Sequence, residues 1–319
     1  MRGIIGTLVM GLCLLTGVAH AQVAVPSFNP GAQGGTATNP AAQQWGAPSR
    51  VVAGMTQGTN VVTPAVGTDD FEFDINGNFL AARGVGESWA IGAEGSSQTF
   101  ESTAPDGFDV SGSVGTTEIA ISGLIGDYLA IGIGQQSSSY VVDDDYTEEA
   151  TLPLIGVSLR IAETIFLGAA GGNETLSWDP DLPNGLEFEE SRQVVRYGAG
   201  FRTGDDTSGF RVEYNVETRQ PITVEIAPNV EVDIAESVSN TASLEFKVAN
   251  IMVGGTVRNT EADESGDVVN RTTTDISIGW VPMQGLTVVA TASSGTATND
   301  SNDDEEKTSL TSVAVGWMF

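Results

Sequence analysis

Charged side chains at alternating positions are the residues of this chain whose types and spacing could do chemistry. If they lie on strands, seven basic residues share inward faces: Arg160, Arg192, Arg196, Arg211, Arg219, Lys247 and Arg258. Five acidic residues are expected on the facing wall: Glu72, Asp74, Glu94, Glu118 and Asp275. Opposite charges across a wet lumen would create a transverse field that acts on passing ions. Salt bridges with neighbouring acids such as Glu213 and Glu217 would instead neutralise the basic wall.

A second set of charges lies in the connections that we expect on the outer side of a membrane. The seven longest predicted connections hold 26 acidic residues and no Lys or Arg. Hard cations bind clustered carboxylates, which makes five residues candidates for loosely bound calcium or magnesium. These are Asp143, Asp144, Asp145, Asp303 and Asp304. The alternatives are a plainly solvated surface and a mouth that attracts cations.

Histidine and cysteine chemistry is confined to the start of the chain. His20 and Cys13 are the only residues of their types. Zinc sites, Ser-His-Asp triads and cysteine nucleophiles need these residues, so we do not expect an enzyme. The formal net charge of −29 also argues against nucleic acid as a partner.

The first 21 residues have the composition of a secretory signal peptide. Arg2 supplies a positive charge, residues 4–18 form an apolar stretch, and Ala19-His20-Ala21 resembles a cleavage site. We therefore expect export, and a mature chain without His or Cys.

Alternating segments separated by turns are the main pattern of the remaining sequence. No run of 18 apolar residues follows Ala21, so only strands could span a membrane. Fourteen candidates are predicted near 49–57, 70–83, 88–100, 114–122, 128–140, 151–161, 165–176, 188–202, 208–222, 237–248, 251–259, 271–281, 286–297 and 307–319. Short turns alternate with longer connections, which places both termini in the periplasm. The sequence predicts an all-β, fourteen-stranded antiparallel transmembrane barrel over 49–319.

The last strand carries the clearest lipid-facing pattern. Val313, Val315, Trp317 and Phe319 share one face. Smaller residues, Ser312, Ala314 and Gly316, share the other. Bulky apolar residues on one face with aromatic residues at its end are typical of a strand between lipid and a lumen.

The stretch 22–48, before the first strand, cannot span a membrane. It has four prolines and no charged residue. Within it, Asn39, Pro40 and Ala41 begin a short run compatible with a helix that extends to Trp45. This segment could fold into the lumen as a plug or hatch, or lie outside the barrel.

The N-terminal stretch with its Asn39-Pro40-Ala41 motif, the fourteen strands and the terminal Phe319 resemble the long-chain fatty-acid and hydrocarbon transporter family (FadL-like) of bacterial outer-membrane barrels. The resemblance implies a hatch inside the barrel and passage of hydrophobic substrates through a lateral opening in the wall. For outer-membrane barrels in general, it implies that the terminal Phe319 is read by the barrel-assembly machinery.

The expected function is passive transport of small solutes, with the resemblance suggesting hydrophobic ones. A cation-preferring general porin is one alternative. A structural or surface-interaction barrel, bridged through its acidic loops and divalent cations to lipopolysaccharide, is another. The expected location is the outer membrane of a Gram-negative bacterium.

Overall fold

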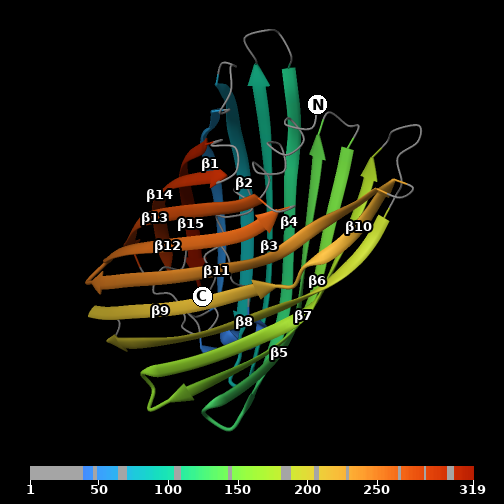
Figure 1. The fold of residues 1–319 in the computed structure, drawn as a ribbon. Coiled ribbons are helices and arrows are strands. Elements are labelled where there is room, and N and C mark those ends of the chain that lie inside the picture. The colour runs from blue at the N-terminus through green and yellow to red at the C-terminus, as the bar shows by residue number, and fades with distance from the viewer. Residues whose placement is uncertain are drawn as a thin grey trace.

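The chain folds into a β-barrel with a short helix, seen in a computed structural model (Figure 1). The structure describes residues 39–45, 49–63, 70–103, 109–142, 146–180, 188–204, 208–227, 230–264, 267–283, 285–299 and 305–319. The predicted signal peptide lies outside these residues. Among the described residues, no helix is long and apolar enough to cross a membrane.

Fifteen strand elements follow the short 3-10 helix η2 (Pro40–Trp45). They are β1 (Arg50–Thr63), β2 (Phe71–Val85), β3 (Trp89–Thr103), β4 (Asp109–Ile125), β5 (Leu129–Val142), β6 (Tyr146–Ile161), β7 (Ile165–Pro180), β8 (Phe188–Gly204), β9 (Ser208–Arg219), β10 (Ile222–Ala227), β11 (Val230–Val248), β12 (Ile251–Glu264), β13 (Asp267–Met283), β14 (Leu286–Asn299) and β15 (Glu305–Met318).

The sheet closes on itself through its first and last strands. β1 pairs antiparallel with β15, from Arg50 opposite Met318 to Thr63 opposite Glu305. From β1 to β9 and from β10 to β15, each strand pairs antiparallel with the next strand along the chain. β9 and β10 do not pair with each other, and both pair with β11. Since β9 and β10 follow one another along the same edge of β11, the barrel has fourteen strand positions. The predicted fold class is confirmed.

Connections at the two ends of the barrel differ less in length than the sequence suggested. The short turns are present, and Ala249-Asn250 joins β11 to β12 with Ala249 at a positive φ of 51°. However, the long outer connections expected near 141–150 and 223–236 are mostly strand. Ladder hydrogen bonds continue beyond the membrane, because a polar strand in water can still pair with its neighbour.

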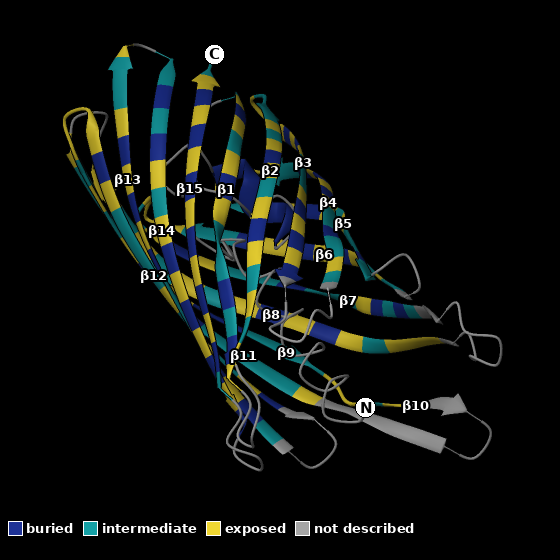
Figure 2. Ribbon diagram, turned by 90° about the horizontal axis from the view of Figure 1, so that it is seen from above, coloured by how far each residue is buried: buried dark blue, intermediate teal, exposed yellow. Residues whose placement is uncertain are grey.

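The two faces of the wall alternate in exposure along each strand (Figure 2). In β15, Ser312 and Ala314 are buried, while Val313 and Val315 are each 50% exposed. Trp317 and Phe319 continue the exposed face. Bulky exposed apolar residues recur on the same face of other strands, as with Ile131 in β5 and Ile278 in β13. This exposed face is the lipid side, and the buried face is the lumen side.

Glu72 and Asp74 do not point into the lumen, contrary to the sequence prediction. Both are exposed on the outer face of β2, whereas Ile75 and Phe79 on the opposite face are buried. The prediction assumed that polar residues face inward along the whole strand. Near the outer end of β2, polar residues face water on the outside while apolar residues pack inside the barrel.

Candidate functional site

The helix η2 lies inside the barrel against the lumen face of β4, β5 and β6. Glycines create the space for it. A Cβ added at Gly132 would lie 2.5 Å from the carbonyl carbon of Pro40, and one at Gly156 would overlap Oδ1 of Asn39. Their neighbours Ile131 and Ile155 face outward, so Gly132 and Gly156 line the lumen. The backbone of the helix can therefore approach the wall closely.

Polar contacts hold both ends of this helix. Asn39 Oδ1 accepts a hydrogen bond from Ala41 N at 3.1 Å, as an N-cap side chain does. Asn39 Nδ2 donates to Val157 O at 3.2 Å, and Trp45 Nε1 donates to Ser158 Oγ at 2.8 Å. The guanidinium of Arg160 lies 4.9 Å from the centroid of the Trp45 ring, a cation–π contact.

The structure therefore places Asn39, Pro40, Ala41 and Trp45 within the lumen, buried against its wall. The rest of the expected hatch, residues 22–38 and 46–48, lies outside the described residues.

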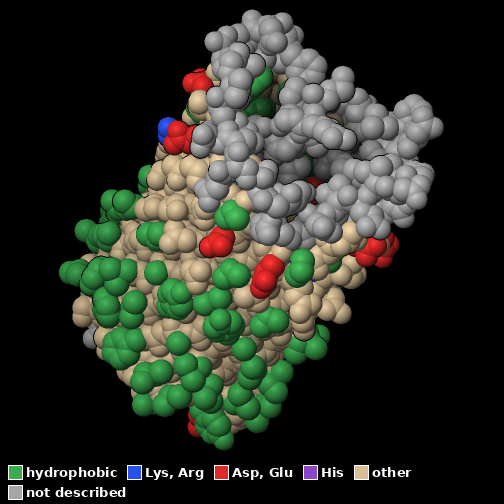
Figure 3. Space-filling model, in the orientation of Figure 1, with side chains coloured by type: hydrophobic (Ala, Val, Ile, Leu, Met, Phe, Trp, Pro, Cys, Tyr) green, Lys and Arg blue, Asp and Glu red, His purple; other side chains and the backbone are tan. Residues whose placement is uncertain are grey.

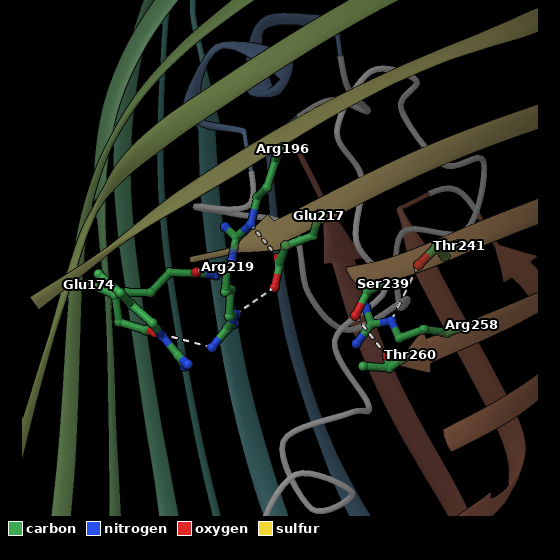
Figure 4. A network of polar contacts seen from close by, with 10 residues as sticks. Glu174, Arg196, Glu217, Arg219, Ser239, Thr241, Arg258 and Thr260 are labelled. Carbon is green, nitrogen blue, oxygen red and sulfur yellow. Dashed lines mark hydrogen bonds and ion pairs between the residues drawn. The ribbon is translucent and has the colours of Figure 1, made fainter. Parts of the chain in front are cut away.

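Ion pairs link β7, β8 and β9 on the lumen side (Figure 4). Glu174 Oε2 is 2.5 Å from Arg192 Nε, and Glu174 Oε1 is 2.9 Å from Arg219 Nη1. Glu217 pairs with Arg219 Nε at 2.9 Å and with Arg196 Nε at 2.5 Å. The arginine wall is thus bridged by its own glutamates, which was the alternative to a transverse field.

The same network crosses part of the lumen. Arg196 Nη2 on β8 donates to Gln136 Oε1 on β5 at 2.8 Å, although β6 and β7 lie between these strands in the sheet. Gln136 Nε2 in turn donates to Glu118 Oε1 on β4 at 2.7 Å. A continuous chain of charged and amide groups therefore runs from β4 to β9 through the barrel interior.

The other charged residues predicted for the lumen are also on inward faces. Arg211 pairs with Glu213, and its Nη1 lies 3.2 Å from Glu245 Oε1. Arg258 Nε donates to Thr241 Oγ1 at 3.3 Å. Three further residues alternate with outward-facing neighbours and so face inward: Glu94, Lys247 and Asp275. Among the twelve predicted charges, Glu72 and Asp74 are therefore the two that the structure places outside.

Two apolar clusters in the lumen were not expected from the sequence. The first, which we call the aromatic cluster, contains Ile75, Phe100, Val114, Tyr140 and Leu310, with Phe73 packed against it. The Phe100 and Tyr140 rings stack with centroids 5.7 Å apart. Its residues come from the outer halves of their strands. The prediction that Glu72 and Asp74 face inward would place Phe73 and Ile75 outside, which is why the sequence did not reveal this cluster.

The second apolar cluster, which we call the side cluster, contains Ala120, Leu152, Leu154, Ala170 and Val194. Val194 is 0% exposed and is the outermost residue of β8 that pairs with β9, opposite Arg219. The side cluster thus lies next to the point at which β8 and β9 part.

The hydrogen-bond ladder of the wall breaks between β8 and β10, although the two strands still lie close together. Beyond Val194, β8 continues to Phe188 and pairs with β7, while β10 pairs with β11. After a hydrogen bond from Gln220 N to Gln193 O of 3.0 Å, no ladder pairing between β8 and β10 is present in the described residues. Pro221 follows this contact and has no N–H to continue the ladder. A shift of register in β11 between Ile234 and Ser237 accompanies the break.

The proposed divalent-cation residues, Asp143, Asp144, Asp145, Asp303 and Asp304, lie outside the described residues. Within the described part of the chain, no group of three or more His, Cys, Asp or Glu could hold a metal ion.

Comparisons with solved structures identify the class of fold. The CymD monoaromatic hydrocarbon channel aligns with a TM-score of 0.59 and 12% identity, over 95% of this chain and 96% of its own. The Pseudomonas putida toluene transporter TodX aligns with a TM-score of 0.59 and 10% identity, over 94% of this chain and 95% of its own. A Pseudomonas aeruginosa FadL homologue aligns with a TM-score of 0.59 and 11% identity, over 88% of this chain and 93% of its own.

The chain therefore has the fold of FadL-like outer-membrane barrels, and the expected resemblance is confirmed at the level of the fold. No protein-family model matches the sequence, and no curated protein matches it either. The similar structures are described as channels and transporters, not as enzymes.

Proposed function

We propose that the protein is a passive outer-membrane channel for small hydrophobic solutes. The observation that carries this proposal is the break between β8 and β10, with the side cluster beside it. A water-filled porin needs an open column along its axis, whereas here a helix and an ion-paired network occupy the interior. A hydrophobic solute could instead leave through the wall without crossing a polar exit.

The height of the break would let a solute pass between the lumen and the outer part of the lipid layer. Val195 and Tyr197 of β8 face outward with 38% and 51% exposure, whereas the next outward residue, Gln193, is polar. The break begins at this transition. A solute that passed it would meet the outer edge of the acyl chains.

The similar solved structures support the same solute class, since CymD is a monoaromatic hydrocarbon channel and TodX is a toluene transporter. The cation-preferring porin and the surface-interaction barrel gain no support from these comparisons. Export by the signal peptide and insertion through Phe319 by the barrel-assembly machinery belong to the proposal as its route to the membrane.

Conductance tests the proposal against the porin alternative. In planar bilayers the full chain should give little ionic conductance, and removal of residues 22–48 should raise it, because η2 occupies the lumen. Liposomes that contain the full chain should not swell in arabinose. Large, stable open channels from the full chain, with rapid arabinose swelling, would identify a general porin instead.

A further inference from the structure

Basic side chains are kept off the outer face of the barrel. Among the described residues, Lys307 is the only basic residue that is exposed, and the others are buried or half-buried. The face drawn in Figure 3 accordingly shows hydrophobic and acidic side chains and almost no basic ones. The positive charge of the strands therefore lies inside, where each guanidinium needs an acidic partner or a ligand.

Two arginines at the periplasmic end of the lumen face each other across neighbouring strands. Arg50 at the start of β1 lies directly opposite Arg83 near the end of β2. Both point inward, because their neighbours Val51 and Ala82 are exposed on the outer face. Like charges at directly opposite positions destabilise a sheet, so an anion bound between them would stabilise this pair.

The guanidinium of Arg83 has one edge without a partner. Its Nε and Nη2 atoms are buried and have no hydrogen-bond partner in the described part of the chain. The charged neighbour that acts on it is Arg50, which repels it. Arg50 in turn is attracted by Glu94 and Glu245. The Nε–H bond and one Nη–H bond lie side by side on a guanidinium, and this edge can bind both oxygens of a carboxylate.

A second arginine pair of the same barrel is neutralised by the chain itself. Arg202 lies opposite Arg211 across β8 and β9. There, Arg211 pairs with Glu213 and with Glu245. The free edge of Arg83 has no such partner among the described residues. A countercharge from outside the chain would complete this end of the lumen.

The residues next to the pair are apolar. Val52 and Ala81 are the next inward residues of β1 and β2 and lie opposite each other. They pack with Phe79 in one apolar cluster. Phe79 covers the following row, since a Cβ added at Gly54 would overlap its ring. Successive inward residues on a strand are about 7 Å apart, so the apolar row between the arginines and Phe79 is about as high as one aromatic ring.

We propose that Arg50 and Arg83 bind a small organic monocarboxylate, with its acid group on the two guanidinium groups and an apolar part of about one ring against Val52 and Ala81. Two arginines beside Glu94 leave one positive charge, which a monoanion balances. The apolar row favours an acid with a hydrocarbon group over a fully hydrated ion such as phosphate. The inference does not depend on which solute is transported.

Titration calorimetry of the full chain in a neutral detergent at low salt tests the class of ligand. Benzoate is the probe, benzyl alcohol is its neutral counterpart, and inorganic phosphate is an anion without an apolar part. Benzoate should bind about tenfold or more tightly than either, because benzyl alcohol lacks the charged hydrogen bonds and phosphate lacks the apolar contact. Equal affinity for benzyl alcohol would overturn recognition of a carboxylate. Equal affinity for phosphate would overturn the role of the apolar row, and with it the proposal.

Substitutions locate the site. Arg83→Gln should weaken the binding of benzoate by about tenfold or more. Arg83→Lys should recover part of the affinity, because lysine keeps the charge without the edge of two parallel donors. Lys307→Gln is the control, since it removes the same charge from the exposed end of β15 and should leave the affinity unchanged.

Heat-modifiable migration shows whether each variant has folded. Unchanged binding of benzoate by a folded Arg83→Gln barrel would overturn the assignment of the site. The comparison of benzoate with benzyl alcohol in the unmodified protein tests the proposal even where this variant does not fold.

Discussion

Each wall residue takes its environment from two coordinates, the face it occupies and its height on the strand. Asp74 and Val313 both face outward, yet Asp74 lies in the polar outer part of its strand and Val313 lies in the apolar, lipid-facing part. Phe73 and Ser312 both face inward, yet Phe73 packs on the aromatic cluster and Ser312 hydrogen-bonds to Thr56 at 2.9 Å. Residue type alone therefore does not give the face.

A charge placed in the apolar, lipid-facing part of the wall should cost far more stability than the same charge in the polar outer part of a strand. Val315→Arg should lower the free energy of unfolding in a bilayer by about 2–4 kcal/mol, as arginine near the lipid midplane does. Ser309 lies on the same face of β15, in its polar outer part. Ser309→Arg should therefore change the free energy of unfolding little. Denaturant titration in lipid vesicles measures both variants. Equal losses of stability would mean that the lipid-facing region is not where the exposed apolar residues place it.

The glycine cradle should control the position of η2. Gly156→Val puts a side chain where Asn39 Oδ1 lies, so the helix should leave the wall and the ionic conductance should rise. Gly95→Ala is the control, because its Cβ would be 3.7 Å from the nearest atom, Thr116 O. Single-channel recording compares the two. A Gly156→Val barrel that assembles and conducts like the unmodified protein would show that η2 does not restrict the pore.

At the scale of elements, the strands could be predicted because membrane insertion imposes a strict alternation and a minimum length. All fourteen positions were found, and their centres agree with the structure. Several predicted strands were too short at their outer ends, because the polar outer parts of these strands have the composition of loops. The prediction that Glu72 and Asp74 face inward was wrong. Apolar residues face outward and polar residues inward only where the wall contacts lipid.

The family resemblance implied a lateral opening in the wall, but its position was not predicted, although Pro221 gave a signal for it. The predicted strand 208–222 was continued through Pro221, and proline cannot donate to a central ladder. The arginines of the lumen network were predicted, and so was their neutralisation by neighbouring glutamates as one alternative, but Glu174 and Gln136 were not. Contacts such as Arg196 with Gln136 depend on how the barrel closes across three-dimensional space, and the strand pattern contains no such information.

A reversible link across the break tests whether it is the exit. Ser191→Cys with Ile222→Cys places a thiol on each side, on strands that do not pair there. Oxidation should reduce hydrocarbon uptake, and a reductant should restore it. Thr117→Cys with Ser137→Cys joins positions that are already paired and should have no effect. Uptake that is unaffected by the oxidised link across the break would exclude this exit.

At the scale of the whole molecule, the barrel combines a sheet that closes through β1 and β15 with an occupied interior. The helix fills the space along β4 to β6, the ion-paired network runs from β4 to β9, and the aromatic cluster lines the outer half. These features oppose a continuous water column. The break beside the side cluster supplies an alternative route that favours solutes with little cost of dehydration.

Uptake of labelled toluene by cells with an intact lipopolysaccharide outer membrane is the most direct test of this account. Cells that produce the barrel should take up toluene faster than cells with an empty vector, while their uptake of arabinose should be the same. Faster arabinose uptake without any change for toluene would contradict a hydrophobic-solute channel.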